Sequence, residues 1–218
     1  MVALVPTHRQ PPERLLLDAI GSFVGRVLVV DDGSAAPFGR LLERRVAAAG
    51  AELLRLGGNR GKGSAIRAGL DRLRGEPAPP AGVLVLDADG QHPPDAIPRL
   101  LAASADADLV VGDRLPERAA MPWERRLANL TASGLIAAAT RRRVRDSQCG
   151  MRLLARRALC DVPFPAGRYE AESLHLKRCL RARVAVAWVP IPALYDGQPS
   201  SYRTVADSLR VLRAIGRR

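Results

Sequence analysis

Residues 83–91 read Val-Leu-Val-Leu-Asp-Ala-Asp-Gly-Gln, an unbroken apolar run that ends in two carboxylates. Such a run, bounded by turn residues, is typical of a strand that is buried on both faces. Asp87 and Asp89 therefore follow the end of a strand, where open α/β sheets bind their ligands. Two carboxylates so close together repel each other unless protons or a cation neutralise them, and their hard oxygens suit Mg²⁺ or Mn²⁺. A solvated turn is the competing interpretation.

Alternating apolar runs and helical patterns predict an α/β fold along the rest of the chain. The length of 218 residues fits one large domain. The alternation predicts a mostly parallel sheet that is flanked by helices and joined by right-handed crossovers. Strands are predicted over 2–5, 26–30, 51–56, 83–86, 107–111 and 184–189, and helices over 12–21, 37–49, 63–74, 94–104, 121–139, 169–181 and 202–215.

The charge and hydropathy of the chain limit the classes of protein to which it could belong. The formal net charge is +12, but only Lys62 and Lys177 are lysines, so a bias toward arginine explains the charge without a polyanionic partner. An aromatic content of 4% offers few stacking side chains, and we expect no nucleic-acid partner. No stretch approaches the roughly 18 apolar residues of a membrane span. The apolar residues 2–5 are too short for a signal peptide, so we expect a cytoplasmic protein.

Polar motifs also follow the first two predicted strands. Pro6-Thr7-His8 ends the first, and Asp31-Asp32-Gly33-Ser34 ends the second. In a parallel sheet these ends share one edge with Asp87 and Asp89, so we expect the motifs to converge. The glycine-rich loop 57–63 precedes a helix, and its free N–H groups and Lys62 favour an anion. The combination predicts a pocket for a nucleoside diphosphate.

In this order the motifs resemble family 2 glycosyltransferases with the GT-A fold. The likeness is strongest to the branch of dolichyl- or polyprenyl-phosphate mannose and glucose synthases, and it is looser beyond residue 160. It implies a single domain with a Rossmann-like sheet, in which residues 1–112 bind the nucleotide sugar and residues 113–218 bind the acceptor. The matching stretches are 29–34, 59–63, 86–91, 111–114 and 146–152.

The resemblance implies a role for each motif residue. On the donor side, Pro6, Thr7 and Asp32 would hold the nucleoside, with Asp32 on the base or ribose, and Lys62 would lie near the nucleotide. Asp87, Asp89 and Gln91 would bind Mg²⁺ or Mn²⁺, and Asp87 would also contact the sugar nucleotide. Arg114 and Arg152 would face phosphates, Arg203 and Glu172 would serve the acceptor, and Asp146 would orient an arginine or act as a base. His8-Arg9 replaces the Tyr-Asn that is common in the family, which leaves the base open.

The implied reaction is an inverting, metal-dependent transfer of a hexose from a donor of the UDP-glucose or GDP-mannose type to a lipid phosphate. A polyprenyl phosphate is already an anionic nucleophile and needs arginines rather than a base. A soluble or protein hydroxyl acceptor would need a base, for which Asp146 and Glu172 are the candidates. A sugar nucleotidyltransferase is a further alternative, but that class usually carries a glycine-rich loop where this chain has Pro6-Thr7-His8-Arg9.

The predicted helix 121–139 has the composition of a membrane-surface helix. Trp123, Leu127, Leu130, Leu135 and Ile136 are its apolar residues, and Arg141-Arg142-Arg143 follows the helix. An amphipathic helix with a basic end suits an anionic lipid surface. We therefore expect peripheral contact with the inner face of the cell membrane.

Overall fold

The computed structural model describes residues 1–194 and 204–216. It contains a seven-stranded sheet in the order β3-β2-β1-β4-β6-β5-β7. All neighbouring strands are parallel except for the two pairs that β6 makes with β4 and β5. The strands are β1 (Val2–Thr7), β2 (Val27–Asp31), β3 (Glu52–Arg55), β4 (Gly82–Val85), β5 (Leu109–Asp113), β6 (Arg152–Ala155) and β7 (Val186–Pro190).

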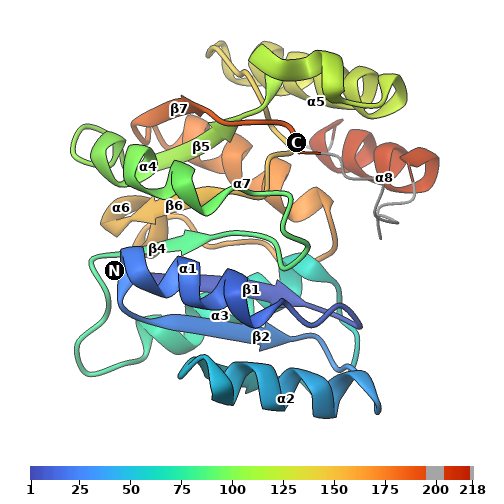
Figure 1. Cartoon of the computed structure of the whole chain (residues 1–218). Coiled ribbons are helices and arrows are strands. Elements are labelled where there is room, and N and C mark those ends of the chain that lie inside the picture. The colour runs from blue at the N-terminus through green and yellow to red at the C-terminus, as the bar shows by residue number, and fades with distance from the viewer. Residues whose placement is uncertain (195–203, 217–218) are drawn as a thin grey trace.

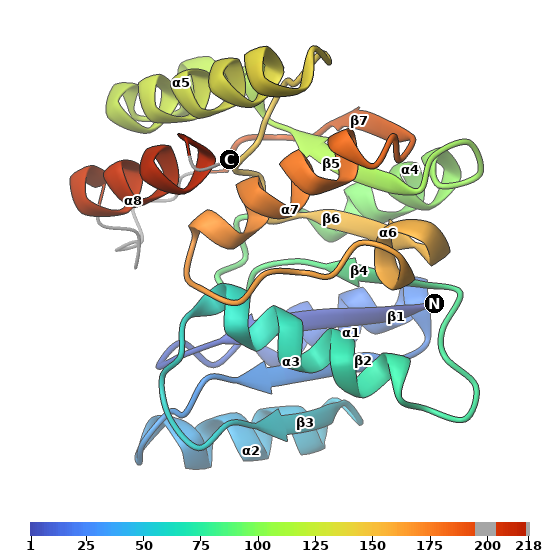
Figure 2. The same ribbon diagram turned by 180° about the vertical axis from the view of Figure 1, so that it is seen from behind.

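Helices cover both faces of the sheet. The helices α1 and α4 lie on the face toward the viewer in Figure 1, and α3 and α7 lie on the face seen in Figure 2. The helices α5 and α8 pack on each other and on α7, beyond the β5–β7 end of the sheet. The helices are α1 (Arg14–Val24), α2 (Phe38–Ala48), α3 (Lys62–Arg74), α4 (Ile97–Ala103), α5 (Trp123–Thr140), α6 (Arg156–Cys160), α7 (Glu170–Arg181) and α8 (Thr204–Gly216), with 3₁₀ turns η1 (Pro94–Ala96) and η2 (Leu115–Ala120).

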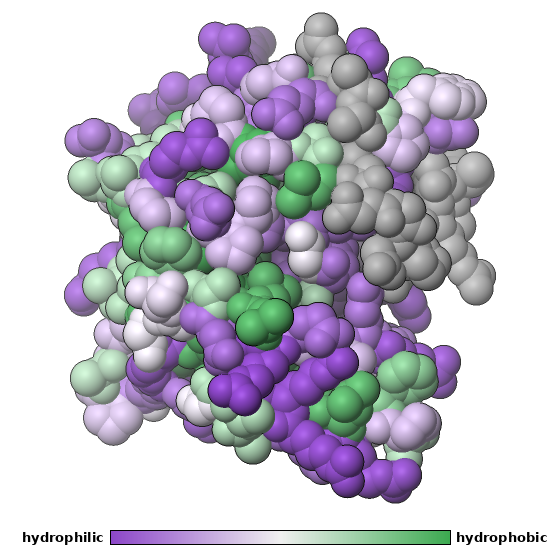
Figure 3. Space-filling model, in the orientation of Figure 1, coloured by the Kyte–Doolittle hydropathy of each residue, from purple (hydrophilic) through white to green (hydrophobic). Residues whose placement is uncertain are grey.

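The central strands form the core because they are covered on both sides. Every residue of β1, β2, β4 and β5 is buried, whereas the edge strand β3 is only partly covered. Continuous burial explains why these strands read as apolar runs rather than as alternating patterns. On the face shown in Figure 3, hydrophilic side chains are interspersed with small groups of hydrophobic ones.

The predicted α/β class and the mostly parallel sheet are confirmed. The sequence did not predict β6 and α6, which follow each other at 152–160. The apolar runs of this segment, Leu153-Leu154-Ala155 and Ala158-Leu159-Cys160, are too short to show a clear period. Pairing with β4 and β5, which are distant in sequence, makes this segment a strand.

Candidate active site

The carboxyl ends of β2, β1 and β4 lie side by side and bring the polar motifs together. Thr7 pairs in register with Asp31, and the N–H of Asp32 donates to the Thr7 carbonyl at 2.9 Å. The N–H of Leu86 donates to the Leu4 carbonyl at 3.2 Å, which carries β4 forward to Asp87. The convergence of the motifs thus follows from the parallel pairing of these three strands.

Asp32 holds the glycine-rich loop. Its buried carboxylate accepts the N–H of Arg60 at 2.8 Å and the N–H of Gly61 at 2.7 Å. The structure therefore gives Asp32 a loop-fixing contact that the sequence did not predict. On the same edge, a ring nitrogen of His8, Nδ1, lies 2.9 Å from the Asp32 carbonyl oxygen.

The start of α3 has backbone partners within the protein. The N–H of Gly63 donates to the Arg168 carbonyl at 3.2 Å, and the N–H of Ser64 donates to the Gly167 carbonyl at 3.0 Å. Together with the two N–H groups that Asp32 engages, these bonds occupy four of the N–H groups between Arg60 and Ser64. The expectation that free N–H groups of this loop bind an anion therefore does not hold for Arg60, Gly61, Gly63 and Ser64, and it stays a prediction for the rest of the loop.

Lys62 is a counter-ion inside the protein. Its Nζ lies 2.5 Å from Asp87 Oδ1 and 3.0 Å from Glu172 Oε1. Burial alone would lower the pKa of Lys62, but the two carboxylates outweigh it and raise this pKa above its ordinary value. Burial likewise works to raise the pKa of Asp87, yet Lys62 holds it below its usual range. Lys62 thus joins α3, the end of β4 and α7 through charge.

The carboxylate of Asp89, unlike that of Asp87, has a pKa above its usual range. Burial and the charge of Asp87 raise the pKa of Asp89, and its Oδ1 accepts the N–H of Gln91 at 3.0 Å. His92 accepts the N–H of Asp87 at 3.1 Å, and burial lowers the pKa of His92 to about 4, so this ring is neutral at pH 7. A carboxylate with a raised pKa beside a second carboxylate and an amide fits a hard divalent cation.

The described residues include no group of three or more His, Cys, Asp or Glu side chains that could hold a metal ion. Such an ion would therefore complete its shell with water or substrate oxygens, as Mg²⁺ commonly does. Asp87, Asp89 and Gln91 fit this partial donor set, since their side chains offer oxygen and follow one strand.

Asp146 clamps Arg114 through two oxygens. Arg114 Nε donates to Oδ2 at 2.8 Å, and an Nη donates to Oδ1 at 3.0 Å. Asn129 of α5 donates to Oδ1 at 2.8 Å. Burial works to raise the pKa of Asp146, but the charge and hydrogen bonds of Arg114 and the amide of Asn129 outweigh it, so this pKa is lowered. A lowered pKa keeps Asp146 ionised, and its two oxygens hold the guanidinium of Arg114 in place.

Arg152 is a structural residue. It is fully buried and donates to the carbonyls of Cys149, Glu172 and Ser147, each at 2.7 Å. The expectation that Arg152 faces a phosphate is wrong, because its guanidinium lies inside the protein and holds the 147–149 loop against α7.

Of the remaining predicted site residues, the structure describes all but one. Thr7 donates its hydroxyl to the Gln10 carbonyl at 2.5 Å, and Pro6 is buried in β1. Glu172 is buried beside Lys62 rather than open to an acceptor. Arg203 lies outside the described residues.

Sequence reasoning missed one residue that shapes the site. Asn129 supports Asp146, and its rarity was a usable signal, since Asn59 is the chain's other asparagine. Gly150, in the motif 146–152, suits a close backbone approach because it has no Cβ. Its partner in the structure is Asp87, since an added Cβ would lie 2.5 Å from Asp87 Oδ2.

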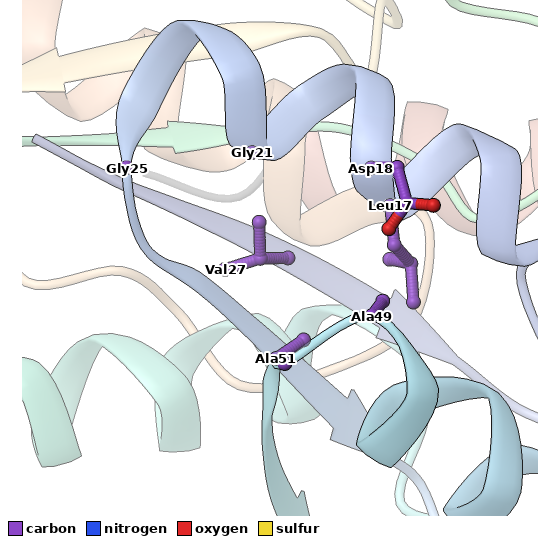
Figure 4. Close-up of a pocket in the computed structure, with 8 residues that line it drawn as sticks. Leu17, Asp18, Gly21, Gly25, Val27, Ala49 and Ala51 are labelled. Atoms are coloured by element: carbon purple, nitrogen blue, oxygen red, sulfur yellow. The ribbon is translucent and has the colours of Figure 1, made fainter.

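A cavity of about 290 Å³ lies at the opposite edge of the sheet, between α1 and the starts of β2 and β3 (Figure 4). Asp18 is its one ionisable lining residue, and the others are small or apolar. No converging polar groups give it a chemistry. It is lined by Leu17, Asp18, Gly21, Gly25, Val27, Ala49, Gly50 and Ala51.

The solved structures that this chain resembles identify its sheet and helices as a GT-A fold. Glucosyl-3-phosphoglycerate synthase from Mycobacterium tuberculosis aligns with a TM-score of 0.76 and 22% identity over 98% of this chain and 78% of that one. Mannosyl-3-phosphoglycerate synthase from Rubrobacter xylanophilus aligns with a TM-score of 0.71 and 21% identity over 98% of this chain and 72% of that one. At these identities the likeness establishes the fold.

The sequence model of the family described as Glycosyl transferase family 2 matches residues 3–162, and the chain belongs to this family. The family is the one that the motifs predicted. Among curated relatives, an undecaprenyl-phosphate 4-deoxy-4-formamido-L-arabinose transferase of Edwardsiella ictaluri is 34% identical over 58% of this chain and 38% of its own length. The protein of that name in Pseudomonas aeruginosa strain LESB58 is 38% identical over 48% of this chain and 31% of its own. The chain thus spans less than half the length of these relatives.

Proposed function

We propose that this glycosyltransferase moves a hexose from a nucleotide-diphosphate sugar to a polyprenyl-phosphate-type lipid. The names of the curated relatives support a lipid-phosphate acceptor. The observation that carries the proposal is the state of Asp146 and Glu172, the two candidate bases for a hydroxyl acceptor. Each is buried and paired with a cation, Arg114 or Lys62. An anionic phosphate needs no base, so this site suits it better than a hydroxyl.

The proposed step is a single displacement that inverts the anomeric carbon. A phosphate oxygen of the acceptor forms the new bond to that carbon, and the bond to the departing nucleoside diphosphate breaks with its electron pair. The guanidinium of Arg114, fixed by Asp146, supplies positive charge to the acceptor phosphate. On the donor side, Lys62 partly offsets the negative charges of Asp87 and Glu172.

Asp87, Asp89 and Gln91 would hold Mg²⁺ or Mn²⁺. When bound, such an ion neutralises charge on the leaving diphosphate. Chelation with EDTA is expected to abolish transfer, and added Mn²⁺ or Mg²⁺ to restore it. Full activity in excess EDTA would remove the metal from the proposal.

The acceptor is tested with a matched pair of lipids. The purified protein is incubated with radiolabelled UDP-glucose or GDP-mannose and either undecaprenyl phosphate or undecaprenol. We expect labelled lipid only with the phosphate. Equal labelling of undecaprenol, or labelling of soluble sugars alone, would favour a hydroxyl acceptor and contradict the proposal.

We also propose peripheral contact with the inner face of the cell membrane through the outer side of α5. Trp123 is 71% exposed and Leu127 is 58% exposed, and Leu130 and Leu135 share this exposure at 42% and 44%. Arg141–Arg143, directly after the helix, are also exposed. Apolar side chains beside arginines complement an anionic bilayer surface. None of the helices in the described part of the chain has the length and hydrophobicity that a bilayer crossing requires.

Flotation with phosphatidylglycerol vesicles tests this contact. Leu127→Glu should release the protein from the vesicles, because it places a negative charge on the apolar side of α5. Leu15→Glu is the matched control, since Leu15 is 81% exposed on the distant helix α1. Equal flotation of the two variants would show that α5 is not the docking element.

A further inference from the structure

The inner side of α5 carries polar residues that the proposed reaction does not yet use. Asn129 and Ser133 are 1% and 3% exposed, although both are polar residues in the middle of a helix. Buried amides and hydroxyls are costly unless they are hydrogen-bonded. Their partners therefore indicate why they are there.

Both residues bond to the loop that follows α5. Asn129 Nδ2 donates to Asp146 Oδ1 at 2.8 Å, and Ser133 Oγ donates to Asn129 Oδ1 at 3.1 Å. The N–H of Ser147 donates to Ser133 Oγ at 3.1 Å. A carboxylate accepts and cannot donate, so the amide nitrogen of Asn129 must face Asp146. The hydroxyl of Ser133 fixes this orientation of the amide.

Asp146 passes this constraint on to Arg114. Its oxygens accept Nε and Nη of Arg114 in a two-point contact, which sets the plane as well as the position of the guanidinium. Asn129 bonds to Oδ1, the oxygen that also accepts the Nη. The backbone N–H groups of Arg114 and Gln148 also bond to Asp146, each at the longer distance of 3.2 Å. Loss of the amide would therefore loosen the hold on Oδ1 and let the carboxylate, and the guanidinium with it, shift from this orientation.

We propose that Asn129 is a positioning residue that sets the Arg114 guanidinium for the acceptor phosphate through Asp146. The inference rests on the proposed function, since it takes Arg114 as a ligand of that phosphate. A purely structural Asn129 would affect folding alone. A positioning Asn129 affects the acceptor and leaves the donor untouched.

Asn129→Ala and Asn129→Asp are compared with the control Thr140→Ala. Thr140 lies on the same helix, and its hydroxyl bonds only to the Ile136 carbonyl of α5 itself. With undecaprenyl phosphate as acceptor, Asn129→Ala should raise the acceptor KM by about tenfold and leave the donor KM unchanged. Thr140→Ala should change neither constant.

Asn129→Asp adds a pH signature. At pH 8 two adjacent carboxylates repel, so the acceptor KM is high. Their mutual repulsion raises the pKa of the pair, and near pH 5.5 a shared proton restores a hydrogen bond to Asp146. The acceptor phosphate itself gains a proton near pH 6, so each variant is compared with the wild type at the same pH. The ratio of the acceptor KM of Asn129→Asp to that of the wild type should fall as the pH falls, whereas the ratio for Asn129→Ala should stay constant.

Other groups near Asp146 do not imitate this response. Among the described residues, Arg114, His92 and Cys149 are titratable groups that interact electrostatically with Asp146. Burial lowers the pKa of His92 to about 4 and raises the pKa of the Cys149 thiol to about 12. Neither group titrates between pH 5.5 and 8, and an arginine stays charged throughout.

The outcomes separate the two proposals. Calorimetric binding of geranyl phosphate, a short soluble acceptor, accompanies the kinetics. If the wild type binds it and transfers sugar but both Asn129 variants match the wild type, the positioning role is overturned and the proposed function stands. If the wild type neither binds it nor labels undecaprenyl phosphate, the proposed function and the inference fall together. Should Asn129→Ala not fold, the pH response of Asn129→Asp decides.

Discussion

At the scale of single residues, Lys62 is the least expected feature of the site. The motif in which it lies suggested a ligand for the nucleotide, and the structure places its ammonium between two carboxylates. A buried cation with two anionic neighbours is hard to remove, because each orphaned carboxylate then bears its own desolvation cost. Lys62 is therefore important for stability as well as for charge at the donor side.

Lys62→Met keeps the length of the side chain and removes its charge. We expect the free energy of unfolding at pH 8 to fall by about 2 to 4 kcal/mol, less than for a fully enclosed pair because the Asp87 side chain is 24% exposed. Urea titration measures the loss. Adding Glu172→Gln to Lys62→Met should recover part of it, because one orphaned charge is then gone. No recovery in the double variant would show that the Glu172 contact adds nothing.

Gly150 offers a second test at this scale. A Cβ at residue 150 would lie 2.5 Å from Oδ2 of Asp87, so Gly150→Ala must displace that carboxylate. We expect kcat to fall by about tenfold or more, since the metal and the donor both depend on Asp87. Gly134→Ala is the control, because Gly134 lies in α5 with nothing within 4 Å of an added Cβ. Equal activity of the two variants would argue against a role for this contact.

At the scale of elements, the helices α3 and α7, which contain Lys62 and Glu172, are in close contact. A Cβ at Gly63 would lie 2.2 Å from the Cβ of Ala171. Gly63→Ala should therefore push the helices apart and lower the free energy of unfolding by about 1 to 3 kcal/mol, the usual range for overpacking. Thermal unfolding compares this variant with Gly57→Ala, where an added Cβ meets nothing within 4 Å. A destabilisation that is the same in both variants would contradict the packing argument.

The elements also show what a sequence can predict. The strands β1, β2 and β4 could be predicted as apolar runs because helices cover both of their faces. Since parallel strands were predicted, the motifs that follow them were expected at one edge of the sheet. The hydrogen bond between Arg114 and Asp146 could not be predicted from the sequence. It joins residues that are 32 positions apart, and no periodic pattern in the sequence relates them. The role of Arg152 was predicted wrongly for a related reason. The sequence motif does not show whether its arginine faces a phosphate or three buried carbonyls.

At the scale of the whole molecule, buried histidines make stability depend on pH. Burial and the charge of Arg152 lower the pKa of His175 to about 3. The unfolded imidazole binds a proton near pH 6.5 and the folded one does not, so the contribution is fully present above that pH. It is lost as the pH falls from 6.5 toward 3, by about 1.4 kcal/mol per pH unit.

His175→Gln removes this titration. Between pH 7 and pH 5 the wild type should lose about 2 kcal/mol more than the variant, as measured by urea unfolding at both values. Both proteins should share the further loss that comes from His92, whose pKa is also lowered, to about 4. Parallel losses in the two proteins would show that His175 does not stay neutral in the folded state.

The position of β6 has a consequence for synthesis. The ribosome completes β4 and β5 before it reaches the four residues of β6, yet β6 lies between them in the sheet. Until that strand emerges, β4 presents a row of unpaired peptide groups, and such open edges recruit other chains. A nascent chain that stalls before residue 152 should therefore aggregate or need a chaperone. The open edge of β4 is covered only when β6 has been synthesised and has paired with it.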